Sequence, residues 1–261
     1  MFNIVISSAQ NRTGRSTCAK ILSKVLDMPK TSAGDLLRLF ALEYVRGIKR
    51  GELVDQFING RSINHIFEEH VNLTSDEFVN FHTNIASIDK SFDIEIEKYV
   101  IKTFLKGGFI IDTVIGNMII HLLQDSSSKV FDTFVSSGDF SFDDVRFIKQ
   151  NSICIYFEAD IDVRASRSAY YESFHGNESS VAKEKELLLD RELSNKNRYQ
   201  DLYDFNLYHG ANWYDFKFDT SAHNPIEICT QTIENNERMH QRAKELGIHD
   251  IRKAVETNAD W

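Results

Sequence analysis

The chain has 261 residues, of which 42% are hydrophobic, so it is long enough to bury a sizeable core. Its 39 acidic residues outnumber its 30 basic ones, and the net charge of −9 disfavours a general nucleic-acid-binding protein, whose affinity comes mostly from cations on phosphates. The three cysteines are isolated in the sequence, and no apolar run approaches the roughly 20 residues of a membrane helix. The N-terminus lacks a signal-peptide pattern. We therefore expect a cytoplasmic protein without membrane or nucleic-acid partners.

The first elements are a strand, a loop and a helix. The apolar, β-branched run 2–7 is typical of a buried parallel strand, and the loop 8–17 reads SAQNRTGRST. Apolar residues at helical spacing follow, and Pro29 ends this predicted helix: they are Cys18, Ile21, Leu22, Val25 and Leu26. A second helix begins near Asp35, and the segments 44–75, 76–81 and 94–105 also have helical character.

Further strands are predicted at 109–112, 152–157 and 213–218. Between and after them we expect a helix capped by Asp160, a charged helix at about 181–203 and a polar, helix-like C-terminal segment, whereas 124–150 indicates no single type of element. Strands that alternate with helices predict a parallel sheet with helices on both faces. Ligands bind at the carboxyl ends of such strands, so the loop 8–17, Asp112 and residues 159–160 should cluster in space.

The loop 8–17 partly fits the phosphate-loop pattern G-x-x-x-x-G-K-[ST]. Ala9 stands at the first glycine position, Gly14 and Ser16 fit, and Arg15 replaces the lysine. Backbone N–H groups and the helix N-terminus do most of the phosphate binding in such loops, and they survive side-chain changes that keep the loop shape. The alternative interpretation is an ordinary polar turn between a strand and a helix.

A set of stretches follows the loop in a characteristic order. They read SAGDLLRLFALE (32–43), IDKSFDIEIEKYVIKTFLKGGFIID (88–112), EADIDVRASR (158–167), DRELSNKNRY (190–199) and FDTS (218–221). In this order and spacing, residues 2 to about 234 resemble the cytidylate kinase family of P-loop nucleoside monophosphate kinases, with a degenerate phosphate loop. The resemblance implies a three-layer α/β P-loop kinase fold with a parallel, about five-stranded sheet. It also implies a helical monophosphate-binding insertion at about 35–100 and a lid at about 168–195, with residues 235–261 left as a polar C-terminal extension.

The resemblance also implies site residues for the transfer of the γ-phosphate from ATP, with Mg²⁺, to CMP or dCMP. The residues that would bind ATP are Gly14, Arg15, Ser16, Thr17, Arg164, Arg167 and Thr220, with Ser16 also on the metal. The residues that would act in catalysis are Arg15, Asp112, Arg191 and Arg198. The residues that would bind the acceptor are Ser32, Gly34, Asp35 and Arg38. Phosphoryl transfer needs several cations around the transferred group and a lid that excludes water, and these residue types suit that need.

Two departures from the family pattern keep a second hypothesis open. Arg15 replaces the lysine, and Val114 stands after Asp112 where the family has a phosphate-binding arginine. The chain could therefore be a degenerate kinase-fold protein that binds nucleotide or a protein partner without turnover, or a P-loop kinase for another small molecule. The candidate residues also have plainer interpretations: Arg191 and Arg198 as solvated helix charges, Arg38 as a surface charge and Asp112 as a turn cap.

Overall fold

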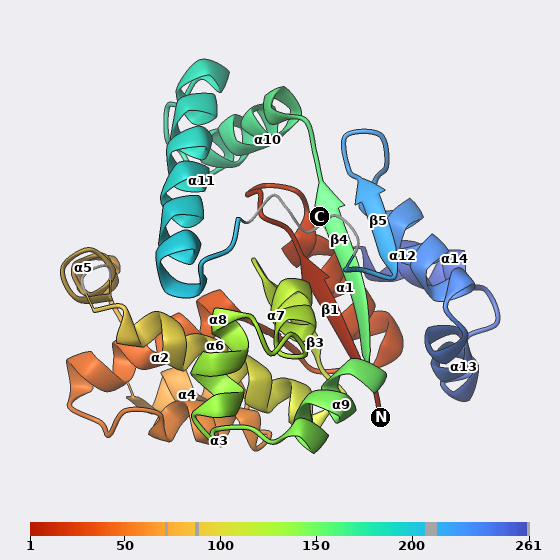
Figure 1. Ribbon diagram of the computed structural model, residues 1–261. Coiled ribbons are helices and arrows are strands. Elements are labelled where there is room, and N and C mark those ends of the chain that lie inside the picture. Colours follow the sequence, from red (N-terminus) through yellow and green to blue (C-terminus); the bar gives the residue numbers. More distant parts are fainter. Residues whose placement is uncertain (71–72, 87–88, 207–212, 260–261) are drawn as a thin grey trace. The chain divides into compact units, whose positions relative to one another are not determined.

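The computed structural model describes residues 1–70, 73–86, 89–206 and 213–259 (Figure 1). The chain divides into two compact units. Unit 1 comprises Met1–Lys30 and Gly108–Trp261, and unit 2 comprises Thr31–Gly107. In the parts of the chain that the structure describes, no helix is both long enough and apolar enough to cross a membrane.

A five-stranded sheet organises the fold, in the order β2-β3-β1-β4-β5. The strands are β1 (Asn3–Ser7), β2 (Lys30–Ser32), β3 (Ile110–Thr113), β4 (Ser152–Glu158) and β5 (Phe216–Asp219). Strand β1 runs parallel to both neighbours, with Val5 opposite Ile111 on one side and Cys154 on the other, and β5 runs parallel to β4. This strand order, with the loop directly after the central strand, confirms the predicted parallel, five-stranded α/β sheet.

Helices cover both faces of the sheet in unit 1. Alternation along β1 sends Ile4 and Ile6 into a core shared with helices α1 (Arg15–Leu26), α12 (Pro225–Asn235), α13 (Glu237–Glu245) and α14 (Ile251–Asn258). Val5 faces the opposite side, where a side chain at Gly116 would meet it at 2.7 Å. Gly116 begins α7 (Gly116–Leu122), so a glycine here lets this helix approach the strand closely.

The other helices of unit 1 are α8 (Lys129–Phe131), the π-helix η2 (Asp132–Ser136), α9 (Phe142–Gln150), α10 (Ile161–Phe174) and α11 (Val181–Tyr203). Thus the stretch 124–150, for which the sequence indicated no single element, contains α8, η2 and α9. Helix α10 begins after Asp160, whose side chain accepts from the Asp162 N–H, as the sequence predicted.

The C-terminal segment contributes to the core of unit 1. Its buried side chains pack with α1: Met239, Ala243, Ile251 and Val255. The apolar spacing of this segment therefore reflects packing against α1, although most of its residues are polar. Residues 260–261 of the expected extension lie outside the described part of the chain.

The last strand begins later than predicted. Residues 213–215 precede β5, and the carboxylate of Asp215 accepts the Cys154 N–H at 2.7 Å. The prediction was wrong here because the aromatic run WYDF reads as a continuous strand, whereas a side chain takes the backbone donor at this point.

After β2, the regular elements in the described residues of unit 2 are all helices. Its elements are α2 (Ala33–Arg46), α3 (Glu52–Ile58), α4 (Ile63–His70), α5 (Ser75–Phe81), the π-helix η1 (His82–Ala86) and α6 (Ser91–Lys106). Edge-to-face aromatic contacts join Phe40 to Phe92 and Tyr99, and Phe81 to Phe92. The buried carboxylate of Glu43 accepts the N–H groups of Gly51 and Leu53, both at 2.7 Å, so it caps the start of α3 from a distant position.

Candidate phosphate-binding site

The loop between β1 and α1 has an unusual backbone shape. Gly14, the N-cap of α1, has φ +86°, and Arg12 has φ +61°. A side chain at Gly14 would meet nothing within 4 Å, so glycine is required by the backbone conformation and not by space. A non-glycine residue with positive φ, such as Arg12, is uncommon and often marks a functional loop.

Arg164 of α10 fixes the first part of this loop. Its guanidinium donates to the carbonyl of Asn11 at 3.4 Å and, through Nε, to the carbonyl of Ala159 at 3.1 Å. The same group forms an ion pair with Glu192 of α11. Arg164 is only 2% exposed, so in this conformation its side chain is committed to the protein.

Arg167, one turn further along α10, fixes the next residue. Its guanidinium donates to the Arg12 carbonyl at 3.5 Å and to both oxygens of Thr220, Oγ1 at 3.1 Å and the carbonyl at 2.5 Å. Burial lowers the pKa of Arg167. The structure therefore brings two predicted ATP-binding residues, Arg167 and Thr220, into direct contact.

These contacts determine where the loop's backbone donors point. In a trans peptide the C=O of one residue and the N–H of the next point in opposite directions. Because the carbonyls of Asn11 and Arg12 face α10, the N–H groups of Arg12 and Thr13 face away from it. In the described residues, the backbone N–H groups of 12–17 find no protein acceptor, and the first bond of α1 is from the Cys18 N–H to the Gly14 carbonyl at 3.1 Å. A run of such donors at a helix N-terminus is suited to an anion.

Ser16 and Asp112 meet at the edge of this loop. The Ser16 hydroxyl donates to the Asp112 carboxylate at 2.5 Å. Separately, the Gln10 side chain accepts the Ala159 N–H at 2.9 Å. The predicted clustering of the loop with the ends of β3 and β4 is thereby confirmed. Asp112 is 6% exposed, and its carboxylate and the Ser16 hydroxyl are hard oxygen donors of the kind that Mg²⁺ prefers, so the residues present fit this ion.

Arg15 is directed to the same carboxylate. Its Nη1 lies 3.4 Å from Asp112 Oδ1, and its side chain is 16% exposed. The residue that replaces the loop lysine thus forms an ion pair inside unit 1. Thr17 is half-buried at the start of α1.

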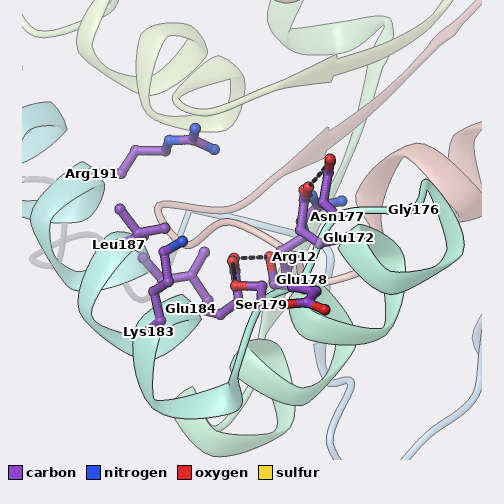
Figure 2. A pocket seen from close by; sticks show the side chains of 12 residues that line it. Arg12, Glu172, Gly176, Asn177, Glu178, Ser179, Lys183, Glu184, Leu187 and Arg191 are labelled. Carbon is purple, nitrogen blue, oxygen red and sulfur yellow. Dashed lines mark hydrogen bonds and ion pairs between the residues drawn. The ribbon is translucent and has the colours of Figure 1, made fainter.

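A cavity of about 690 Å³ lies beside the loop, between α10 and α11 (Figure 2). Its lining includes Arg12 of the loop and, from α11, Lys183, Leu187 and Arg191. The α11 residues are spaced by four, so they share one face of the helix. Figure 2 shows Arg12 and Arg191 among the side chains around this cavity. Lys183 and Arg191 have no ion-pair partner in the described parts of the chain.

The buried carboxylate of Glu184 connects the two helices that line this cavity. Glu184 of α11 accepts hydrogen bonds from Ser179 Oγ at 2.5 Å and Ser168 Oγ at 2.7 Å. These hydrogen bonds, first from Ser179 and then from Ser168, lower the pKa of Glu184. The carboxylate therefore stays ionised and joins α10 to α11 at neutral pH.

Arg198 lies two turns beyond Arg191 on α11 and is not among the residues that line the cavity. It is half-buried, with its guanidinium 5.5 Å from the ring of Tyr199. The sequence pattern singled out Arg191 and Arg198 but passed over Arg12 and Lys183. Two signals were available: a cation within the four variable loop positions, and a lysine eight residues before Arg191.

The predicted acceptor residues form the N-terminus of α2 in unit 2. Ser32 is the N-cap, and its hydroxyl accepts the Asp35 N–H at 3.0 Å. Gly34 lies in the first turn, where an added Cβ would be 3.6 Å from that hydroxyl. Arg38 is 3.4 Å from the Asp35 carboxylate, and its side chain is 55% exposed.

Comparisons with known proteins give structural matches only. No protein-family model matches the chain, and no curated protein matches it in sequence. Among solved structures, an uncharacterized protein from Eubacterium ventriosum is 13% identical over 90% of this chain and 97% of its own, with a TM-score of 0.46. A shikimate kinase from Bacteroides thetaiotaomicron is 12% identical over 94% and 97% of the two chains, with a TM-score of 0.39. A shikimate kinase from Aquifex aeolicus is 15% identical over 89% and 94%, with a TM-score of 0.37.

Proposed function

We propose that this protein is a P-loop phosphotransferase that binds ATP at the loop between β1 and α1. The observation that carries the proposal is the set of backbone N–H groups of residues 12–17, which lack protein acceptors in the described chain while arginines hold the neighbouring carbonyls. Such donors, at the positive end of α1, favour a polyphosphate over a neutral ligand.

Mg²⁺ would be held at this site by Ser16 Oγ and the Asp112 carboxylate, which already lie in contact. When bound, the ion neutralises negative charge on the phosphates. Few protein ligands suffice because Mg²⁺ usually keeps several waters and takes phosphate oxygens.

The side chains of unit 1 divide into binding and positioning roles. Arg191 and Lys183, on one face of α11, bring cations to the transferred phosphate from the side of the predicted lid. Arg164 was predicted to contact ATP, but its burial and its ion pair favour a positioning role, in which it holds the loop in its binding shape. Arg167 does the same for Arg12 and keeps Thr220 in place.

The acceptor we propose is CMP or dCMP, bound by the start of α2 in the monophosphate-binding insertion. Ser32, Gly34 and Asp35 form a capped helix N-terminus there, and Arg38 is a largely exposed cation. Its ion pair with Asp35 is of the exposed type that contributes little stability, so an acceptor phosphate could replace it.

A second candidate is a nucleotide-binding protein without turnover. The ion pair of Arg15 with Asp112 favours it, because a guanidinium near this carboxylate competes with a metal ion for the same oxygens. Nothing in this pair prevents the backbone donors from binding phosphate. The two candidates therefore agree on binding and differ on catalysis.

Two measurements separate the candidates. Calorimetric titration with ATP, with and without Mg²⁺, tests binding, and coupled ADP release with CMP, dCMP, UMP and AMP tests turnover. ATP binding with ADP release on CMP or dCMP would support the kinase, and ATP binding without release on any acceptor would support the second candidate. A folded protein that does not bind ATP, with or without Mg²⁺, would contradict both.

A further inference from the structure

Arg12 has a position that the phosphate-loop pattern does not explain. It occupies one of the variable positions of the loop, in the left-handed backbone region with φ +61°. Its guanidinium lies 4.2 Å from the ring centroid of Tyr171, and Nη2 lies 3.6 Å from the carboxylate of Glu172. Both partners belong to α10, and Arg12 and Glu172 line the cavity shown in Figure 2.

Arg15 and Arg12 differ in their availability to a ligand. Arg15 is 16% exposed and its partner Asp112 is 6% exposed, so separating this nearly buried ion pair costs more than separating an exposed one. Arg12 is 32% exposed, its carboxylate partner is 28% exposed, and water can replace either of them at low cost. The backbone of Arg12 is held by Arg167, so its side chain can move while the loop keeps its shape.

We propose that Arg12, and not Arg15, is the loop side chain that contacts the phosphates of bound nucleotide, and that it leaves Glu172 to do so. This inference rests on the proposed ATP site. A guanidinium binds phosphate oxygens in a bidentate manner, and phosphate carries more negative charge than the half-exposed carboxylate of Glu172. Replacing Glu172 with phosphate as the partner of Arg12 is therefore favourable. The ring of Tyr171 can stay against the guanidinium in both states, because a cation–π contact tolerates small displacements.

The change of partner of Arg12, from Glu172 to phosphate, couples ligand binding to α10. In the structure, the Arg12–Glu172 ion pair and the Tyr171 contact tie the C-terminal half of α10 to the loop. When the phosphates take Arg12, the ion pair is lost and this part of α10 is held less firmly. Nucleotide occupancy is thus transmitted from the loop to the helix that leads into the predicted lid.

ATP affinity of point variants tests the proposal, measured by calorimetric titration with Mg²⁺ present. We expect Arg12→Ala to weaken ATP binding by roughly 10- to 100-fold, the usual value of one charge-assisted contact, and Arg12→Lys to recover part of the loss. We expect Glu172→Gln to tighten ATP binding a few-fold, because Arg12 then has no charged partner to leave. If the Arg12–Glu172 pair had only a structural role, Glu172→Gln would weaken ATP binding instead of tightening it. Arg46→Ala is the matched control, since it removes an Arg–Glu pair of similar exposure, 27% and 33%, from unit 2.

The outcomes distinguish this inference from the proposed function. If wild-type protein binds no ATP, the proposed function fails, and this inference fails with it. If wild-type protein binds ATP and Arg12→Ala binds it equally well, or if Arg15→Ala alone abolishes binding, only the inference is overturned.

Hydrogen exchange measures the coupling to α10. We expect ATP to accelerate exchange in the α10 segment 171–174 of the wild type and to leave it unchanged in Arg12→Ala, where exchange is already fast. Slower exchange in this segment of the wild type at saturating ATP would overturn the proposed release of α10.

Discussion

The buried ion pair between Arg164 and Glu192 gives the strongest prediction about stability. The Arg164 side chain is 3% exposed and that of Glu192 is 9% exposed, so Arg164→Ala leaves a carboxylate without its cation in a dry environment. Breaking a buried pair in this way typically costs about 3–5 kcal/mol. The variant also loses the hydrogen bonds to the carbonyls of Asn11 and Ala159, so we expect a loss of at least about 3 kcal/mol and a fall in melting temperature of roughly 6–20 °C.

Thermal unfolding followed by circular dichroism measures this loss, with Lys217→Ala as the control. Lys217 pairs with Glu158 across β4 and β5 at 2.8 Å, but the two side chains are 37% and 41% exposed, so the control should lose less than about 1 kcal/mol. The double variant Arg164→Met, Glu192→Leu should recover much of the loss, because an apolar pair leaves no buried charge.

The reasoning would be refuted by two results. The first is an Arg164→Ala variant that melts within a few degrees of the Lys217→Ala control. The second is a double variant that is less stable than Arg164→Ala alone. Either result would mean that water reaches Glu192, so the pair does not fix the loop through a buried contact.

Three more predictions concern the loop, the metal site and pH. Gly14→Ala and Gly138→Ala change residues of matching φ, +86° and +85°, with open space around each, so both should lower the free energy of unfolding by about 1–2 kcal/mol. Only Gly14→Ala should weaken ATP binding in calorimetric titration, and equal ATP affinity of the two variants would contradict the loop assignment. Asp112→Asn should abolish most of the Mg²⁺ dependence of ATP affinity, and a variant whose affinity still rises with Mg²⁺ as in the wild type would exclude this carboxylate as a ligand. The hydrogen bond from Arg46 lowers the pKa of Glu77 from 4.5 to about 2, so the contribution of Glu77 to stability is present above pH 4.5 and is lost as the pH falls towards 2. Glu77→Gln should therefore reduce the pH dependence of the free energy of unfolding in that window, and a variant with the same pH dependence as the wild type would contradict this prediction.

Sequence periodicity predicted the elements that carry the site. The run 2–7, the loop and the helix with Cys18 and Leu22 appear as β1, the loop and α1, because a buried strand and an amphipathic helix each have their own spacing of apolar residues. The contact of Ser16 with Asp112 was also predictable, since parallel strands place their carboxyl ends at one edge of the sheet. The short strand β2 was missed because its three residues are too few to show a period.

The same periodicity could not assign partners. A spacing of four shows that α11 has a face with Lys183 and Arg191, but it does not show what that face meets. In the same way, the C-terminal residues Met239 and Val255 are spaced as in an amphipathic helix, and only packing against α1 reveals that they belong to the core.

The sequence by itself therefore determined a parallel α/β protein with a glycine-containing loop at the start of α1 and an acidic residue beside it. These features depend on neighbours in the chain, namely the alternation in strands, the spacing in helices and the freedom of glycine at positive φ. Only the tertiary structure decided which group each arginine contacts. Arg164 meets the Asn11 carbonyl across 153 residues and Arg15 turns to Asp112, whereas Arg12 stays half-exposed beside α10. Those choices depend on burial and on charges brought together by the sheet, and such distant pairings leave no periodic trace in the sequence.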